Sequence, residues 1–286
     1  MSISRKCISL KRILRAGMLL LLLPGCVVAI PMHEIERSET LGGGVMRIQA
    51  VGIGETPFLD VEPEEYTEED LTGSVGSKAG AITHSLTLGL ADNLDLELEY
   101  SHSAQSNGFR GGLKYQWLGE HHYFDKIQDT LSSSIAVRFL SVSGGAWNSD
   151  TDRTVPDPWY VTNSTSVASF QISIPTGYRL SPWLSCFFGP RMATGSLKLD
   201  YRHDAQPGVN LMVKRNYTGF GYFYGLAIHP AGEKAGIELL VEGYRMQLPL
   251  DNRDEHGWYQ GMHVGLAFVL AGTPPGKALR KHQSPK

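Results

Sequence analysis

Few residues in this sequence have the types and the spacing that catalysis or metal binding requires. Asp200 and His203 come at the end of an alternating stretch, where an Asp–His pair could serve acid–base chemistry. Both residue types are also common in exposed connections, so a polar loop is the simpler interpretation. His121 and His122 are adjacent and therefore point in different directions, and no further ligand lies at a suitable spacing. We predict no catalytic residue, no metal and no cofactor.

Charged residues at every second position form a stronger pattern. A symmetric hairpin over this part of the chain would place Glu99 opposite Arg110 and Asp95 opposite Lys114. Directly opposed charges on one face of a sheet contribute roughly 0.2–1 kcal/mol per pair. A long side chain on the next stretch could reach the same wall. We therefore predict a network of six charge-paired residues: Asp95, Glu97, Glu99, Arg110, Lys114 and Arg138.

The first 25 residues have the pattern of an export signal. A basic stretch without acidic residues precedes the apolar run 16–23, which is much shorter than the roughly 20 residues of a membrane-spanning helix. Cys26 follows Gly25 and lies three residues after Leu23, as in a bacterial lipobox, whose cysteine becomes lipidated. Residues 27–29 also fit ordinary signal cleavage, which would remove Cys26. We predict a signal peptide over 1–25 and lipidation of Cys26.

Charge and cysteine content argue against two broad classes of protein. Removal of the signal takes away five basic residues and leaves 21 Lys and Arg against 29 Asp and Glu, a net charge of −8. This acidic balance gives no electrostatic reason to expect nucleic acid as a partner. Cys186 is the one cysteine after Cys26, so the chain is not a disulfide-stapled secreted domain.

From about residue 41 onward, apolar and polar residues alternate with a period of two, as in half-buried strands. The clearest case is a hairpin in which Asp92 and Asn93 form a tight turn between residues 82–90 and 94–100. We predict an all-β fold of about ten antiparallel strands. The other eight stretches are 43–52, 109–117, 134–139, 169–174, 184–199, 219–228, 236–249 and 261–270.

Alternation does not say which face meets water, because a soluble sandwich or cup buries the apolar face and a membrane barrel turns it to lipid. Several stretches reach about ten residues, the span of a tilted transmembrane strand, and aromatic residues gather near their ends. Long and short connections also alternate, which is typical of transmembrane barrels. We read long connections at 54–80, 143–165 and 200–216, and short ones at 92–93, 179–183 and 229–235.

The stretch 87–98, Thr-Leu-Gly-Leu-Ala-Asp-Asn-Leu-Asp-Leu-Glu-Leu, resembles the periplasmic hairpin of bacterial outer-membrane β-barrel proteins. The resemblance extends over about residues 41–271 and implies an outer-membrane location and insertion by the barrel-assembly machinery, but no particular activity. One departure is the basic tail after Leu270, since such chains often end in an aromatic residue of the last strand. An internal assembly signal around Phe268 would account for it.

The expected order is a signal peptide (1–25), an N-terminal linker (26–40), a single antiparallel up-and-down transmembrane β-barrel (41–271) and a basic periplasmic tail (272–286). An even number of strands returns both termini to the periplasm. Ten strands enclose a narrow lumen, so we expect a structural or narrow-passage role among outer-membrane lipids. Two alternatives are a barrel enzyme with a rim site near Asp200 and His203, and a periplasmic lipocalin-like lipoprotein that binds an apolar ligand.

Overall fold

The structure is a computed structural model. It describes residues 27–29, 37–53, 57–63, 71–77, 81–103, 106–119, 128–149, 160–203, 210–228, 235–247 and 258–271. The expected signal peptide, Cys26, the two histidines at 121 and 122 and the basic tail lie outside the described residues. No helix in the described part of the chain is long and apolar enough to span a membrane.

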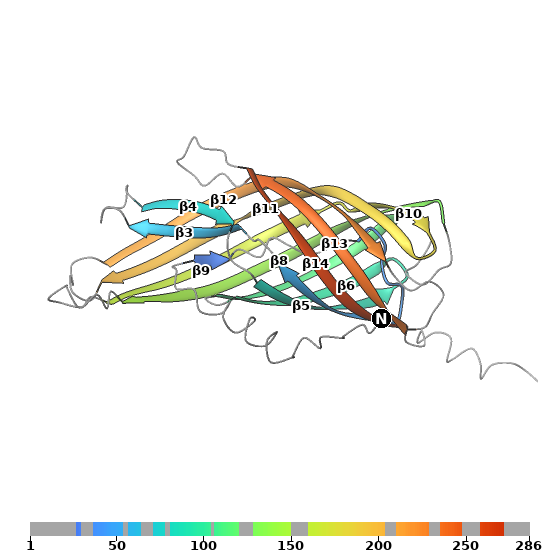
Figure 1. Cartoon of the computed structure of the whole chain (residues 1–286), viewed down its shortest axis with the longest axis horizontal. Coiled ribbons are helices and arrows are strands. Elements are labelled where there is room, and N and C mark those ends of the chain that lie inside the picture. Colours follow the sequence, from blue (N-terminus) through green and yellow to red (C-terminus); the bar gives the residue numbers. More distant parts are fainter. Residues whose placement is uncertain are drawn as a thin grey trace, which may run out of the picture.

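Antiparallel strands that follow one another in the sequence close into a tilted barrel (Figure 1). The chain returns on itself because β14 pairs with β2, and β9 and β10 both pair with β8 and with β11. The predicted all-β barrel of ten strands is confirmed, with β9 and β10 as two parts of one strand. The strands are β2 (Val45–Ile53), β5 (Ala81–Ala91), β6 (Leu94–Ser103), β7 (Ser106–Leu118), β8 (Thr130–Ser149), β9 (Tyr160–Ser173), β10 (Thr176–Ser181), β11 (Leu184–His203), β12 (Asn210–Ile228), β13 (Ala235–Gln247) and β14 (Trp258–Ala271).

The break between β9 and β10 falls at Pro175, which has no backbone N–H to donate to a neighbouring strand. The pairing continues on both sides of it, since the N–H of Ser134 donates to the Pro175 carbonyl and the N–H of Ile174 donates to that of Pro190. Proline therefore interrupts the strand without opening the barrel.

Four strands are longer than their alternation predicts, and the long connections expected at 143–165 and 200–216 are wrong in their extent. β8 continues to Ser149, which pairs with Tyr160 of β9, and Arg202 of β11 pairs with Asn210 of β12. Most of these residues are polar, so their sequence shows no alternation of apolar and polar residues. The period of two disappears there although the sheet continues. β10 likewise runs through the expected turn 179–183 as far as Ser181.

The two ends of the barrel differ. At one end, which we call the turn end, two-residue turns follow β5 and β10. At the other, the loop end, β8, β9, β11 and β12 extend furthest (Figure 1). The expected connection 54–80 leaves from the loop end and contains a hairpin of β3 (Pro57–Pro63) and β4 (Leu71–Ser77). β1 (Val27–Ala29) pairs with β3, so the residues next to Cys26 lie with the loop-end connection.

Candidate functional site

The polarity of the barrel is the reverse of that of a soluble protein. Large apolar side chains face outward, with Phe139 55%, Leu266 58% and Phe188 61% exposed. Charged side chains such as Lys114 and Arg138 point into the barrel, where each is 3% exposed. A lipocalin-like cup would have an apolar interior and a polar exterior, so this arrangement contradicts the alternative of a soluble lipocalin-like lipoprotein.

The six residues of the predicted charge network are all buried in the lumen, on β6, β7 and β8. The register pairs Asp95 with Lys114, as a symmetric hairpin requires, and Lys114 Nζ lies 3.4 Å from Asp95 Oδ2 and 3.6 Å from Glu97 Oε1. Arg138 of β8 donates from Nε to Glu97 Oε2 over 2.7 Å and from Nη1 to the Ser173 hydroxyl over 2.9 Å. Lys114 and Arg138 therefore share the Glu97 carboxylate.

The second pair of the network lies nearer the loop end. Glu99 is opposite Arg110 in the register and accepts a hydrogen bond from the Arg110 guanidinium. Arg110 also donates from Nη1 to the side-chain oxygen of Gln171 on β9, over 3.1 Å. The network thus reaches across four strands, and its charges meet opposite charges and amide groups in a site that is closed to solvent.

An N-terminal segment that the sequence analysis placed in a linker lies inside the turn end of the barrel. Arg37, Ser38, Glu39, Thr40 and Leu41 are each at most 5% exposed. The N–H of Leu41 donates to the Asp95 carboxylate over 3.0 Å, and the N–H of Thr40 donates to Gln116 Oε1 over 2.7 Å. We call residues 37–41 the lumen segment. It joins the predicted network at Asp95.

The other end of the lumen segment is held by ion pairs. Arg179 Nε of β10 donates to Glu39 Oε1 over 3.0 Å, and Arg37 Nη1 donates to Glu238 Oε1 of β13 over 2.6 Å. Arg47 Nε of β2 lies 3.0 Å from the other Glu238 oxygen. The lumen segment therefore contacts strands from several sides of the barrel and crosses its interior.

Sequence reasoning missed these partners for two reasons. Arg179 was assigned to a turn, and Glu238 lies in a stretch whose alternation is weak because apolar Leu240 and charged Glu242 share its inward face. The one available signal was the spacing of Arg37 and Glu39 by two positions. In an extended segment this spacing puts both charges on one face, and two charges on one face indicate that the segment packs against a surface of complementary charge. Nothing in the local sequence placed that surface inside the barrel.

A third group of charges lies on the opposite wall. Arg191 of β11 pairs with Glu242 of β13, Nη2 to Oε1, at 3.2 Å, and its guanidinium carbon lies 4.7 Å from the centre of the Phe223 ring. His263 of β14 is fully buried, with its ring centre 4.8 Å from that of Tyr244. The buried histidine thus packs among aromatic and charged side chains within the wall of the barrel.

Apolar side chains fill much of the remaining interior. Leu140, Val142 and Val167 of β8 and β9 are at most 1% exposed and belong to one cluster with Leu197 and Tyr217 of β11 and β12. On β11 and β12, inward aromatics lie over glycines, since a Cβ on Gly225 would be 2.4 Å from the Phe187 ring. Between the charges and these apolar residues, the described interior is packed with side chains.

Asp200 and His203, the two rim residues, both belong to the loop end of β11. Asp200 and His203 are backbone positions three apart on the continuously paired strand β11, and positions an odd number apart belong to opposite faces of a strand. Asp204 lies outside the described residues. Among the residues that the structure describes, no group of three or more His, Cys, Asp or Glu side chains could hold a metal ion.

A closed antiparallel barrel with buried charges inside and large apolar side chains outside has the fold of the outer-membrane β-barrels. No family model and no curated protein matches the chain.

Solved structures with a similar arrangement of strands come from bacterial outer membranes. The chain is similar to the outer membrane protease OmpT from Escherichia coli, at 11% identity and a TM-score of 0.40, over 81% of this chain and 94% of that chain. Ail, the attachment invasion locus protein of Yersinia pestis, is 7% identical with a TM-score of 0.31, over 80% of this chain and 99% of that chain. The translocator domain of the autotransporter NalP from Neisseria meningitidis is 12% identical with a TM-score of 0.36, over 80% of this chain and 88% of that chain.

Proposed function

We propose that this protein is a closed barrel of the bacterial outer membrane, with a structural or narrow-passage role and no diffusion pore. The observation that carries the proposal is the lumen segment, which crosses the turn end and is bound there by Asp95, Arg179 and Glu238. Behind it the lumen holds the charge network and the apolar cluster. Each layer occupies space that a water-filled channel would need.

The buried charges support a closed barrel because they are paired with one another and do not line a hydrated pore. Groups that line a hydrated channel stay solvated, whereas Asp95, Lys114 and Arg138 are at most 3% exposed and bind one another or the lumen segment. Removing one partner of a buried ion pair leaves a charge that is neither solvated nor neutralised, which is strongly destabilising. The network therefore holds the wall and the lumen segment together.

The proposed orientation places the turn end in the periplasm and the loop end outside, because outer-membrane barrels have short periplasmic turns and longer external connections. Ala271 of β14 pairs with Val45, so the chain leaves the barrel after β14 at the turn end, on the periplasmic side. The pairing of β1 with β3 puts the described N-terminal residues at the loop end instead. In the proposed orientation, the end of β14 therefore lies on the periplasmic side and residues 27–29 lie with the external connection.

Planar-bilayer recording of the full chain tests the proposal. The intact protein is expected to give no steady conductance, and a well-defined open-channel current would refute a closed barrel. A variant in which residues 37–41 are replaced by Gly and Ser separates the two roles. A small current from this variant favours a narrow passage that the lumen segment blocks, whereas continued silence favours a structural barrel. Heat-modifiable migration in gel electrophoresis checks that each variant is folded.

A further inference from the structure

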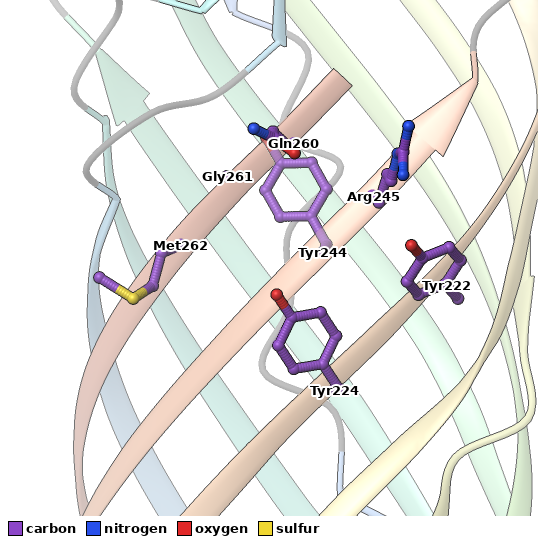
Figure 2. A pocket seen from close by; sticks show the side chains of 7 residues that line it. All are labelled: Tyr222, Tyr224, Tyr244, Arg245, Gln260, Gly261 and Met262. Atoms are coloured by element: carbon purple, nitrogen blue, oxygen red, sulfur yellow. The ribbon is translucent and has the colours of Figure 1, made fainter. Parts of the chain in front are cut away.

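A groove of about 620 Å³ lies on the barrel wall where β12, β13 and β14 run side by side (Figure 2). Tyr222 and Tyr224 line it from β12, Arg245 from β13, and Gln260 and Met262 from β14. All five of these side chains are exposed on the outward face. The groove is therefore open to the surroundings of the barrel, and Tyr244, which is buried on the inward face, also lines it.

Gly243 lets the Tyr224 ring lie close against β13. The register places Tyr224, Gly243 and Met262 in one row across the three strands. A Cβ on Gly243 would lie 2.7 Å from Cζ of the Tyr224 ring, so the ring occupies space over β13 that any other residue would fill. The Tyr224 ring therefore covers Gly243, which is buried, and Met262 follows it in the row on β14.

Arg245 lies at the loop-end side of this row, between Tyr222 and Gln260 in the register. Along the described stretches of β2, β5, β6, β7, β13 and β14, it is the one Asp, Glu, Lys or Arg on the outward face. A cation on the lipid-facing surface is strongly unfavourable near the middle of a bilayer and tolerated at the interface. Arg245 therefore marks the depth at which lipid headgroups meet the barrel.

On the turn-end side, the groove continues into an aliphatic surface. Successive outward residues on the same strands are apolar as far as Ile237, six residues before Gly243, and all of them except half-buried Val241 are exposed. Six residues of strand are about 20 Å long, and at a tilt of about 40° they cover about 15 Å of depth, half of a roughly 30 Å hydrocarbon core. The surface thus pairs one fixed positive charge with an apolar strip about one leaflet deep. The strip contains Leu226, Ile228, Ile237, Leu239, Leu266 and Phe268.

We propose that this groove binds one anionic lipid, with the headgroup phosphate on Arg245 and one acyl chain lying beside Tyr224 and Met262 and along the aliphatic strip. The proposal rests on the membrane location proposed above. The Arg245 guanidinium has the planar geometry that binds phosphate oxygens in pairs. The Tyr222 hydroxyl and the Gln260 amide, which lie in the same row, supply neutral hydrogen-bond donors to the headgroup.

Lipid titration of the full chain in zwitterionic detergent micelles, followed by native mass spectrometry, tests the proposal. The probes are phosphatidylglycerol and phosphatidylcholine with the same short acyl chains. We expect one phosphatidylglycerol per barrel, bound about tenfold more tightly than phosphatidylcholine. Arg245→Ala should weaken that binding about tenfold, because a charge-assisted hydrogen bond is lost. Gly243→Leu should weaken it by filling the groove.

Lys214→Ala is the matched control, since it removes an equal charge from an exposed position on β12 and should leave binding unchanged. Equal binding of the two lipids, or unchanged binding by Arg245→Ala, would overturn the proposal. Competition by millimolar inorganic phosphate alone would also overturn it, because the site would then recognise phosphate without the lipid. Heat-modifiable migration and membrane fractionation test whether the protein is a membrane barrel at all. Failure of the proposed membrane location can therefore be distinguished from failure of the proposed lipid site.

Discussion

The Arg179 guanidinium binds the Glu39 carboxylate inside the barrel, although the two residues are 140 positions apart in the sequence. Arg37 Nη2 lies 3.0 Å from the same carboxylate, and Arg37 Nη1 lies 2.6 Å from Glu238. β10 and β13 are therefore joined through two residues that belong to neither strand. This bridge makes the segment before the first barrel strand part of the folded interior.

Arg179→Ala should lower the free energy of unfolding by about 3 kcal/mol, as expected when one partner of a buried ion pair is removed. Denaturant titration of the barrel refolded in micelles measures the loss. The double variant Arg179→Ala/Glu39→Ala should lose less than the sum of the single changes, since the two groups contact each other. Lys198→Ala, an exposed change on β11, is the control and should stay within about 0.5 kcal/mol of the natural chain. Strict additivity would contradict the bridge.

Arg110→Ala should also destabilise the barrel, because Glu99 would stay buried without its guanidinium partner. The same denaturant titration measures this loss, combined with bilayer recording to detect any current. The informative comparison is Glu97→Gln/Glu99→Gln. A hydrated pore predicts altered ion selectivity with little change in stability, whereas the paired network predicts lower stability and no steady current. Selective conduction by a fully stable variant would show that the wall lines an open channel.

Thiol labelling of intact cells tests the proposed orientation, in a Cys186→Ser background that removes the described free thiol. Cysteine placed at Ser149, at the loop end of β8, should react with a membrane-impermeant reagent. Cysteine placed at Asn93, in the exposed turn between β5 and β6, should react only after the outer membrane is opened. The reverse labelling pattern would show the opposite orientation in the membrane, with the turn end external.

Cys26→Ala should abolish the incorporation of labelled palmitate and leave the protein in the membrane fraction after a carbonate wash. The apolar outer surface of the barrel is the main membrane anchor, and a single acyl chain adds only marginal, reversible binding. Undiminished palmitate incorporation would exclude the lipobox. Release of the variant into the soluble fraction would instead show that the lipid holds the protein at the membrane.

The number of strands and the facing of the charges were predictable from local sequence, because alternation is a property of each strand by itself. The register of β6 and β7 also followed from one symmetric hairpin, in which pairing Asp95 with Lys114 fixes every other pair. The extended parts of β8, β9, β11 and β12 were not predictable in this way. Beyond the apolar band both faces are polar, and only hydrogen bonds to the neighbouring strand reveal that the residues are paired.

The sequence by itself determined about ten alternating strands with charges on one face, since a period of two and the turn at Asp92 and Asn93 are local features. Tertiary structure alone decided that Arg37 and Glu39 lie inside the lumen, and that Arg245 lines one groove with Tyr222 and Gln260. Closure of the barrel brings β10, β13 and the N-terminal segment together across a shared interior, whereas the pairing of β13 with β12 and β14 forms the groove. Contacts between residues as distant as Glu39 and Arg179 depend on that closed geometry, which no local pattern encodes.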